Sequence, residues 1–167
     1  SRWQGLLLLD LNTGKYSLPP FDCGKEIMNM LIDSQNRIWI APYNGGVSCF
    51  THDGTRLASY TTQNSELNND VVLSLAEREG KIWIGTDGGG INILEPKTGK
   101  FTLLEHIPGS DNYSLPANSI LCLYNDRNNN MWAGSIRNGL ISIREVSMKT
   151  YTNVLPGNDN GLSNNTV

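Results

Sequence analysis

The chain has 167 residues, of which 38% are hydrophobic and 17% are charged, and its formal net charge is −3. This length is enough for one domain with a hydrophobic core, and the composition excludes a disordered chain. The longest apolar runs, such as Leu6 to Leu9, are too short to cross a bilayer as a helix. Lys and Arg do not cluster, which argues against a nucleic-acid-binding surface.

The three cysteines, Cys23, Cys49 and Cys122, are an odd number without the spacing of metal ligands. They fit neither a disulfide framework nor a zinc site, so we expect no metal and no cofactor. Cys49 and Cys122 fall within strand patterns, and we predict that both are buried as small hydrophobic residues. Ser1 leads directly into repeat sequence, so no signal peptide is apparent.

A tryptophan-centred motif occurs three times along the chain. It is most complete at residues 81–93, where Lys-Ile-Trp-Ile-Gly-Thr-Asp is followed by Gly-Gly-Gly-Ile. Its centres, Trp39, Trp83 and Trp132, are 44 and 49 residues apart. A period of this size is typical of a solenoid, a propeller or another repeat array.

The same framework surrounds each of these tryptophans. An acid lies six residues before it, a residue that tolerates a left-handed backbone three before it, a small residue two after it, and a glycine seven after it. These positions are Asp33, Asn36, Ala41 and Gly46; Glu77, Gly80, Gly85 and Gly90; and Asp126, Asn129, Gly134 and Gly139. We interpret each acid as a hairpin-turn residue that accepts backbone N–H bonds, rather than as part of a carboxylate ring.

Each repeat contains four strand patterns. The strand before the turn, such as Ile27 to Ile32, is apolar on both faces, so we expect it to be covered on both faces. The tryptophan strand is short and apolar, the third strand alternates, and the fourth is more polar. Four antiparallel strands per repeat predict an all-β fold of β-propeller blades. We predict that the tryptophans pack between blades, where the small residue two positions later permits close approach.

The repeat register predicts the blade boundaries. The segment from Gly5 to Tyr16 aligns without gaps with the segment from Gly90 to Phe101, so the chain opens on the outer half of a blade. The expected units are 1–22 (outer half of a blade), 23–63, 64–112 and 113–156 (blades) and 157–167 (start of the next blade). This is about three and a half four-stranded blades of an expected seven-bladed propeller. Because repeats need neighbours to bury their faces, the expected partners are the remaining blades of a parent propeller or a second copy of the chain.

The segment from Leu67 to Phe101 combines an acid-x-x-Gly-x-Ile-Trp-Ile-Gly-Thr stretch with a later Gly-Gly-Ile and Thr-Gly-Lys-Phe. This combination resembles the two-component regulator propeller repeat, and the resemblance extends over essentially the whole chain. It implies the periplasmic sensor region of a Bacteroidetes hybrid two-component system that regulates glycan use. Kinase activity and membrane attachment would then belong to other parts of a full-length protein. The sequence departs from the repeat at Ala41–Tyr43 and at Ser135–Asn138, near the loop after the tryptophan strand.

The loops between second and third strands are where we expect ligand recognition. Their candidate residues are Tyr43, Asn44, Asp87, Arg137 and Asn138. These residues vary between copies while the framework repeats, as on a recognition surface carried by a fixed scaffold. Tyr can stack on a sugar ring, and Asp, Asn and Arg can bond hydroxyls, a uronate or a sulfate. The alternative is that they are ordinary polar loop residues.

The connections between blades offer a second set of polar residues. These are Asn64, Glu66, Asn112 and Tyr113. Asn68 and Asn118, in the same connections, are expected to cap turns.

No catalytic arrangement is apparent. His52 and His106 occupy different repeat positions without an acid at fixed spacing, and no helix pattern follows Gly88 to Gly90, so an anion-binding glycine loop is not predicted. We therefore favour a non-catalytic extracytoplasmic sensor segment that contributes to recognition of a glycan or oligosaccharide and to signal transmission. The alternatives are a protein–protein interaction propeller and, less favoured, a propeller lyase or hydrolase.

Overall fold

The computed structural model describes residues 5–19, 21–24, 26–109, 114–144 and 148–151. This part of the chain contains fourteen strands and no helix. The first sheet contains β1 (Leu8–Leu9) and β2 (Tyr16–Ser17). The second contains β3 (Ile27–Ile32), β4 (Ile38–Pro42), β5 (Val47–Phe50) and β6 (Arg56–Tyr60). The third contains β7 (Val72–Arg78), β8 (Lys81–Thr86), β9 (Ile91–Glu95) and β10 (Lys100–Leu104), and the fourth contains β11 (Ile120–Asn125), β12 (Met131–Ser135), β13 (Gly139–Ile143) and β14 (Met148–Tyr151).

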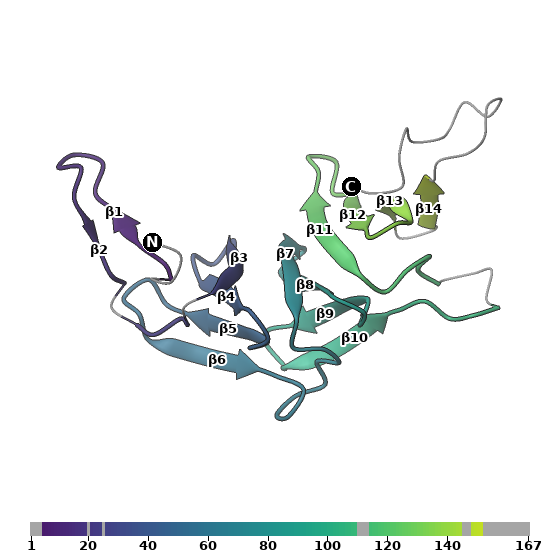
Figure 1. The fold of residues 1–167 in the computed structure, drawn as a ribbon, viewed down its shortest axis with the longest axis horizontal. Helices are drawn as coiled ribbons and strands as arrows, with labels where there is room; N and C mark the ends of the chain where they lie inside the picture. The colour runs from purple at the N-terminus through teal and green to yellow at the C-terminus, as the bar shows by residue number, and fades with distance from the viewer. Residues whose placement is uncertain (1–4, 20, 25, 110–113, 145–147, 152–167) are drawn as a thin grey trace.

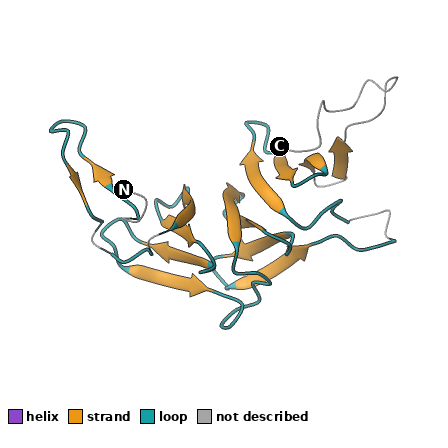
Figure 2. Ribbon diagram, viewed as in Figure 1, coloured by secondary structure: helices purple, strands orange, loops and turns teal. Residues whose placement is uncertain are grey.

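The sheets stand side by side in an arc, with β3, β7 and β11 on its concave side and β6 and β10 at its outer edge (Figure 1). Within each sheet the strands pair antiparallel in chain order, and the connections between them that the structure describes are loops (Figure 2). Successive four-stranded sheets with the first strand innermost are the blades of a β-propeller. The predicted all-β propeller segment is confirmed.

Apolar clusters fill the spaces between sheets. We call the contact of sheet β3–β6 with sheet β7–β10 the first interface, and that of sheet β7–β10 with sheet β11–β14 the second interface. The first contains Trp39, Val47, Leu67, Ile84 and Leu94, among others. The second contains Trp83, Ile91, Leu115, Met131 and Ile141, among others. The predicted packing of the motif tryptophans between blades is confirmed for Trp39 and Trp83, which are 1% and 7% exposed.

The small residues of the motif permit close approach of backbone. A Cβ built on Gly85 would lie 2.9 Å from Cγ2 of Ile120, on the next sheet. Gly46 and Gly90 have φ of 64° and 70°, and a Cβ on either would collide with a main-chain carbonyl oxygen of the fourth strand. A left-handed backbone without room for a side chain requires glycine, which explains why this position repeats.

The inner strands are not all covered on both faces, contrary to expectation. β7 lies between β3 and β11 and is largely buried, whereas β3 and β11 alternate between covered and exposed residues. Met30 is 45% and Tyr124 63% exposed. Cys122 also lies on the exposed face of β11, so its predicted burial is wrong. Cys49 is buried as predicted, and burial raises the pKa of its thiol to about 11.

The register of the β7–β8 hairpin differs by one residue from that of the β3–β4 and β11–β12 hairpins. Trp39 pairs with Leu31 and Trp132 with Tyr124, each eight residues earlier, whereas Trp83 pairs with Ala76, seven residues earlier. The cause is the turn between β7 and β8, which consists of Glu79 and Gly80 alone, with φ of 55° and 74°. Two left-handed residues form the tight turn that matches the twist of a β-hairpin.

This register shift turns the side chains of β7 to the opposite faces of its sheet, because strand side chains alternate with period two. Glu77 consequently contacts Ser34 on the preceding hairpin. Arg78 lies at the second interface, where it lines the same cavity as Trp83 and Ile143. The acid that leads the middle motif is therefore separated from its own tryptophan.

Candidate functional site

The loops predicted to carry recognition lie along one edge of the sheets. They connect β4 to β5 (residues 43–46), β8 to β9 (87–90) and β12 to β13 (136–138). The chain enters β7 through Asp70 and Val71, and β11 through Asn118 and Ser119, at the same edge. We call these three loops and the two entry segments the rim.

Backbone hydrogen bonds make the rim continuous. Gly46 N donates to Asp70 O (3.0 Å), and Asp87 N donates to Val71 O (2.9 Å). Gly90 N donates to Asn118 O (2.7 Å) in the entry segment of the next sheet. Each loop is thus tied to its neighbours, and the rim is a rigid frame rather than a set of separate loops.

Two of the predicted site residues hold this frame together. Asp87 accepts a hydrogen bond at Oδ1 from the hydroxyl of Ser119 (2.8 Å), and its carbonyl accepts from Nδ2 of Asn69 (2.6 Å). Asn138 donates through Nδ2 to the carbonyl of Pro116 (3.1 Å). Both side chains therefore form hydrogen bonds within the chain.

The other three predicted residues present free side chains. Tyr43 is 57% exposed, and Asn44 and Arg137 are also exposed, with φ of 51° and 69°. Within the described residues none of these three side chains has a hydrogen bond. Tyr43 and Arg137 lie on different sheets with sheet β7–β10 between them, so the structure does not bring them together.

The described polar residues of the blade connections form hydrogen bonds within the chain. Asn64 accepts from Thr61 N (2.7 Å), and Glu66 accepts from Phe101 N (3.2 Å). Asn68 donates to Gly89 O (2.8 Å) and Asn118 accepts from His106 N (2.6 Å), so both join separate loops rather than cap one turn. Asn112 and Tyr113 lie outside the described residues.

The motif acid has a role that the sequence did not reveal. Asp33 Oδ2 accepts hydrogen bonds from Trp39 Nε1 (2.8 Å) and Arg37 Nε (2.7 Å), and Asp126 Oδ2 accepts from Trp132 Nε1 (2.9 Å). Both aspartates also accept backbone N–H bonds in their turns, as predicted. The constant spacing of six residues between acid and tryptophan was the available signal for this bond.

These hydrogen bonds shift the pKa of both aspartates. Burial alone would raise the pKa of Asp33, but the bonds from Trp39 and Arg37 outweigh it and lower the pKa below its ordinary value. The bond from Trp132, reinforced by Asn130, holds the pKa of Asp126 far below its usual range. Both carboxylates therefore stay ionised in the folded protein at neutral pH.

Glu77, the acid of the middle repeat, does not accept a hydrogen bond from its tryptophan and lies within β7, so the turn interpretation is wrong for this acid. Its carboxylate accepts from the backbone N–H of Ser34 (2.6 Å) and from the Ser34 hydroxyl. The shifted register of β7 directs Glu77 across the first interface instead of toward Trp83.

A cavity lies beside Trp83 at the second interface. Its volume is about 250 Å³, and its lining residues are Arg78, Glu79, Lys81, Trp83, Ile93, Leu104, Ile143 and Arg144. No sequence argument anticipated it, because it depends on the register of β7 and on two adjacent sheets.

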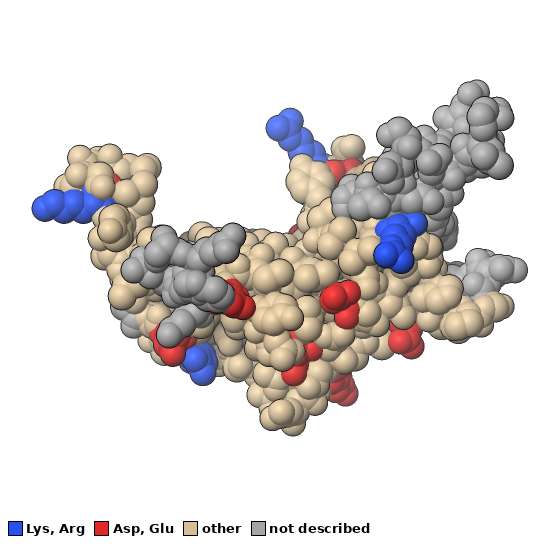
Figure 3. All heavy atoms as spheres, viewed as in Figure 1, with Lys and Arg blue, Asp and Glu red and all other residues tan. Residues whose placement is uncertain are grey.

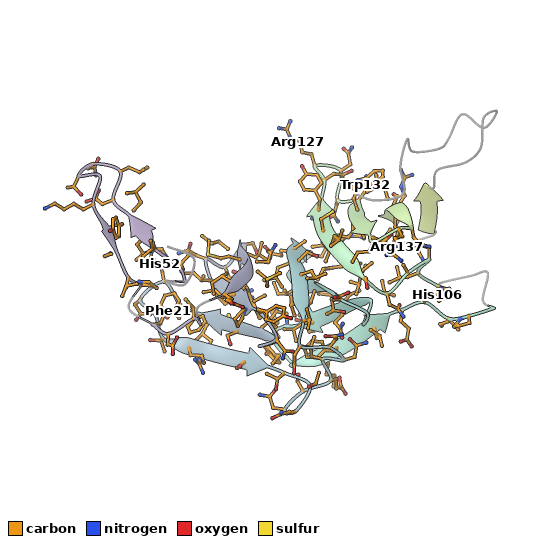
Figure 4. All side chains as sticks on the ribbon, in the orientation of Figure 1. Phe21, His52, His106, Arg127, Trp132 and Arg137 are labelled. Carbon is orange, nitrogen blue, oxygen red and sulfur yellow. The ribbon has the colours of Figure 1, made fainter. Side chains whose placement is uncertain are left out.

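Within the described residues, neither histidine side chain has an acidic hydrogen-bond or ion-pair partner. His52 and His106 lie at opposite ends of the arc (Figure 4). His52 is exposed, and Nδ1 of His106 lies 2.7 Å from the carbonyl oxygen of Leu115. The described residues contain no group of three or more His, Cys, Asp or Glu side chains able to hold a metal ion.

The charges on the visible face are dispersed, with isolated basic side chains and several acidic ones across the middle of the arc (Figure 3). The part of the chain that is described also has no helix with the length and hydropathy needed to cross a membrane.

The sequence and the fold together define the class of protein as a repeat-built β-propeller. The family model described as two component regulator propeller matches residues 66–88 and 114–137. These two segments are similar to the two-component regulator propeller repeat, which confirms the predicted resemblance for this part of the chain. Among curated proteins, none matches the chain.

Several solved structures are similar to the chain. The extracellular domain of the hybrid two-component system BT3049 from B. thetaiotaomicron is 20% identical, with a TM-score of 0.73 over 99% of this chain and 21% of that one. The corresponding domain of BT4673 from the same organism is 16% identical, with a TM-score of 0.69 over 89% of this chain and 22% of that one.

A catalytically inactive virginiamycin B lyase from Staphylococcus aureus is 19% identical, with a TM-score of 0.62 over 90% of this chain and 49% of that one. The chain spans about a fifth of the length of the two-component-system domains and about half of the lyase. At these identities the similarity shows a shared propeller fold.

Proposed function

We propose that this chain is a non-catalytic segment of an extracytoplasmic sensor, the periplasmic part of a hybrid two-component system, and that its rim contributes to recognition of an oligosaccharide. The observation that carries the proposal is the presence of two-component regulator propeller repeats in two successive blades. The fold shared with extracellular domains of two such systems supports it. The separation of the two histidines, which share no acid, speaks against a catalytic site built on them.

The rim has the properties of a recognition surface. Its backbone is fixed by hydrogen bonds, with Asp87 held by Ser119. On this frame Tyr43, Asn44 and Arg137 present unpaired aromatic, amide and guanidinium groups. A sugar offers an apolar ring face for stacking and hydroxyls for hydrogen bonding, and these side chains supply both. A rigid frame also lowers the entropic cost of binding.

Calorimetry with a panel of oligosaccharides tests the proposal. We expect one of them to release heat with a defined stoichiometry, and Tyr43→Ala and Arg137→Ala each to weaken its binding about 10-fold or more. Lys97→Ala, on the exposed turn between β9 and β10, is the matched control and should bind as the wild type does. Binding that is unchanged in both rim variants contradicts the role of the rim. If no oligosaccharide binds but a pull-down with this chain captures a protein, the chain is better described as an interaction platform. If an oligosaccharide of the panel is cleaved, an enzyme is favoured.

We also propose that further blades of a parent propeller, or a second copy of this chain, cover its exposed apolar residues. Leu9, Leu11 and Tyr16 of the first hairpin are 59%, 89% and 71% exposed, and Met30 and Ile32 of β3 are 45% and 54% exposed. Burying such residues is favourable by about 25 cal/mol per Å². Size-exclusion chromatography with light scattering should show self-association of the isolated chain, and a stable compact monomer contradicts this expectation.

A further inference from the structure

The cavity beside Trp83 contains more positive than negative charge. Among the described residues, Arg78, Lys81 and Arg144 line it, and Glu79 is the only acidic residue of its lining. Ile93 and Leu104 supply apolar walls. The volume of about 250 Å³ is enough for a ligand of the size of one sugar ring or a short organic acid, and the net charge favours an anion.

Arg78 has no hydrogen-bond partner for its Nε atom, although the residue is only 9% exposed. The nearest carboxylate oxygen, Oε1 of Glu79, lies 3.8 Å away, beyond hydrogen-bonding distance, and already accepts from Nδ2 of Asn129. The guanidinium carbon lies 5.9 Å from the centre of the Trp83 ring. A buried donor without an acceptor is costly, so this group is suited to an acceptor that the described residues do not supply.

Trp83 also lacks the acceptor that the other two motif tryptophans have. Trp39 and Trp132 donate their indole N–H to the aspartates six residues before them. The corresponding acid of the middle repeat is Glu77, whose carboxylate is bonded to Ser34. Within the described residues the indole N–H of Trp83 has no hydrogen bond.

The first interface shows which group would complete the second. There, one carboxylate oxygen of Asp33 accepts simultaneously from an arginine Nε (Arg37, 2.7 Å) and a tryptophan Nε1 (Trp39, 2.8 Å). At the second interface the only carboxylate near the arginine is that of Glu79, 3.8 Å from Arg78 Nε, and within the described residues no carboxylate accepts a hydrogen bond from Arg78 Nε or Trp83 Nε1. Charge-assisted bonds of this kind are the strong ones in proteins, and the arginine fork suits a carboxylate.

We propose that the cavity at the second interface binds the carboxylate of a small ligand. Arg78 and Trp83 donate hydrogen bonds to it, Lys81 and Arg144 add positive charge, and Ile93 and Leu104 contact the carbon skeleton of the ligand. A uronic acid has this chemistry. The site is separate from the rim and does not depend on the proposed oligosaccharide binding there.

The test is a titration with D-glucuronate, with D-glucose as the uncharged match and glucose 6-sulfate as the alternative anion. The indole N–H signal of Trp83 in a nitrogen–proton NMR spectrum is the readout. Saturable movement of that signal with glucuronate, and none with glucose, is expected. No movement at 100 mM glucuronate (about the weakest binding worth measuring), or an equal response to glucose, overturns the proposal. A stronger response to the sulfate overturns the assignment to a carboxylate.

Two variants locate the site, and neither removes the fold-defining ring. Arg78→Met keeps the length of the side chain without its charge and should weaken glucuronate binding about 30-fold or more. Trp83→Phe keeps an aromatic ring without the N–H, and should weaken binding about 10-fold when followed through neighbouring backbone signals.

Trp39→Phe makes the same change at the first interface and should leave glucuronate binding unaltered. Glucuronate binding that persists unchanged in both Arg78→Met and Trp83→Phe contradicts the proposal. Tyr43→Ala should also bind glucuronate normally, so failure at the rim and failure at this cavity are seen separately.

Discussion

The two interfaces between four-stranded sheets derive from the same repeat but differ in the side chains that surround the motif tryptophan. At the first, Trp39 stacks on Tyr60 with ring centroids 6.4 Å apart, and Tyr60 meets the edge of Phe101 at 5.6 Å. Asp33 receives the Trp39 N–H. At the second, Leu104 occupies the strand position of Tyr60, and a cavity lies beside Trp83.

The difference between the two interfaces follows from strand register. A two-residue turn at Glu79 and Gly80 shifts the pairing of β7 by one residue. That shift sends Glu77 to the first interface, where it bonds Ser34, and leaves Arg78 beside Trp83. The spacing of acid and tryptophan along the chain is unchanged. Strand register alone can therefore change which side chains meet at an interface between blades, without any insertion.

The largest contrast is expected from truncating the two tryptophans. Trp39→Ala should lower the free energy of unfolding by about 3–5 kcal/mol, because it empties a closely packed site. Trp83→Ala should cost at least about 1 kcal/mol less, since its ring already borders a cavity and is less completely buried than Trp39. Urea denaturation followed by circular dichroism measures both. Equal losses would show that the two interfaces are packed alike.

Removing the two leading acids should reveal their different roles. Asp33→Ala leaves the Trp39 and Arg37 donors without their shared acceptor and should cost about 2–3 kcal/mol of unfolding free energy. Glu77→Ala removes more exposed bonds to Ser34 and should cost about 1 kcal/mol or less. The urea midpoints of the two variants provide the comparison, and a larger loss for Glu77→Ala would contradict the assigned roles.

The pH dependence of stability should reveal the contribution of the ionised carboxylates of Asp33 and Asp126, which accept the tryptophan N–H bonds. The folded-state pKa values of Asp33 and Asp126 lie below the ordinary value of 3.8. Their stabilisation is thus fully present above about pH 4, the unfolded pKa, and is lost as pH falls from there toward the folded pKa.

Urea midpoints between pH 6 and pH 2.5 should fall less steeply for Asp33→Asn and Asp126→Asn than for the wild type. A residual slope is expected from Asp10 and Asp53, whose pKa values are also lowered by hydrogen bonds in exposed turns. If the dependence of the urea midpoint on pH is unchanged in both variants, the carboxylates of Asp33 and Asp126 do not control acid stability.

The fold could be read from the sequence because local signals repeat. The tryptophan period fixed the blade size, and Gly46, Gly90 and Gly139 each have positive φ at the equivalent position. Exposure of β3 and β11 could not be predicted, because an apolar strand has the same composition whether or not a neighbouring sheet covers it. The exposure of Cys122 has the same origin.

The site was only partly predictable. The sequence located the rim loops, but it did not separate Asp87, which is fixed by Ser119 from 32 residues later, from the free Tyr43. The cavity was missed because Glu77 and Asp33 look equivalent in spacing. The remaining signal was the Glu79–Gly80 pair, which favours a tighter hairpin turn than the Gln35–Asn36 pair.

The last prediction concerns a substitution at the second interface, Leu104→Tyr, that introduces the aromatic ring found at the first. Leu104 faces Ile91 across the sheet as Tyr60 faces Val47, so Leu104→Tyr places a ring where the first interface has one. The new ring should fill the cavity beside Trp83 and raise the free energy of unfolding by about 1 kcal/mol, the usual contribution of an aromatic pair. The same change should abolish the glucuronate response of the Trp83 N–H, because the ring takes the space of the ligand. Leu103→Tyr, on the other face of β10, is the control and should change neither property. A stable Leu104→Tyr variant that still binds glucuronate would place the carboxylate outside this cavity.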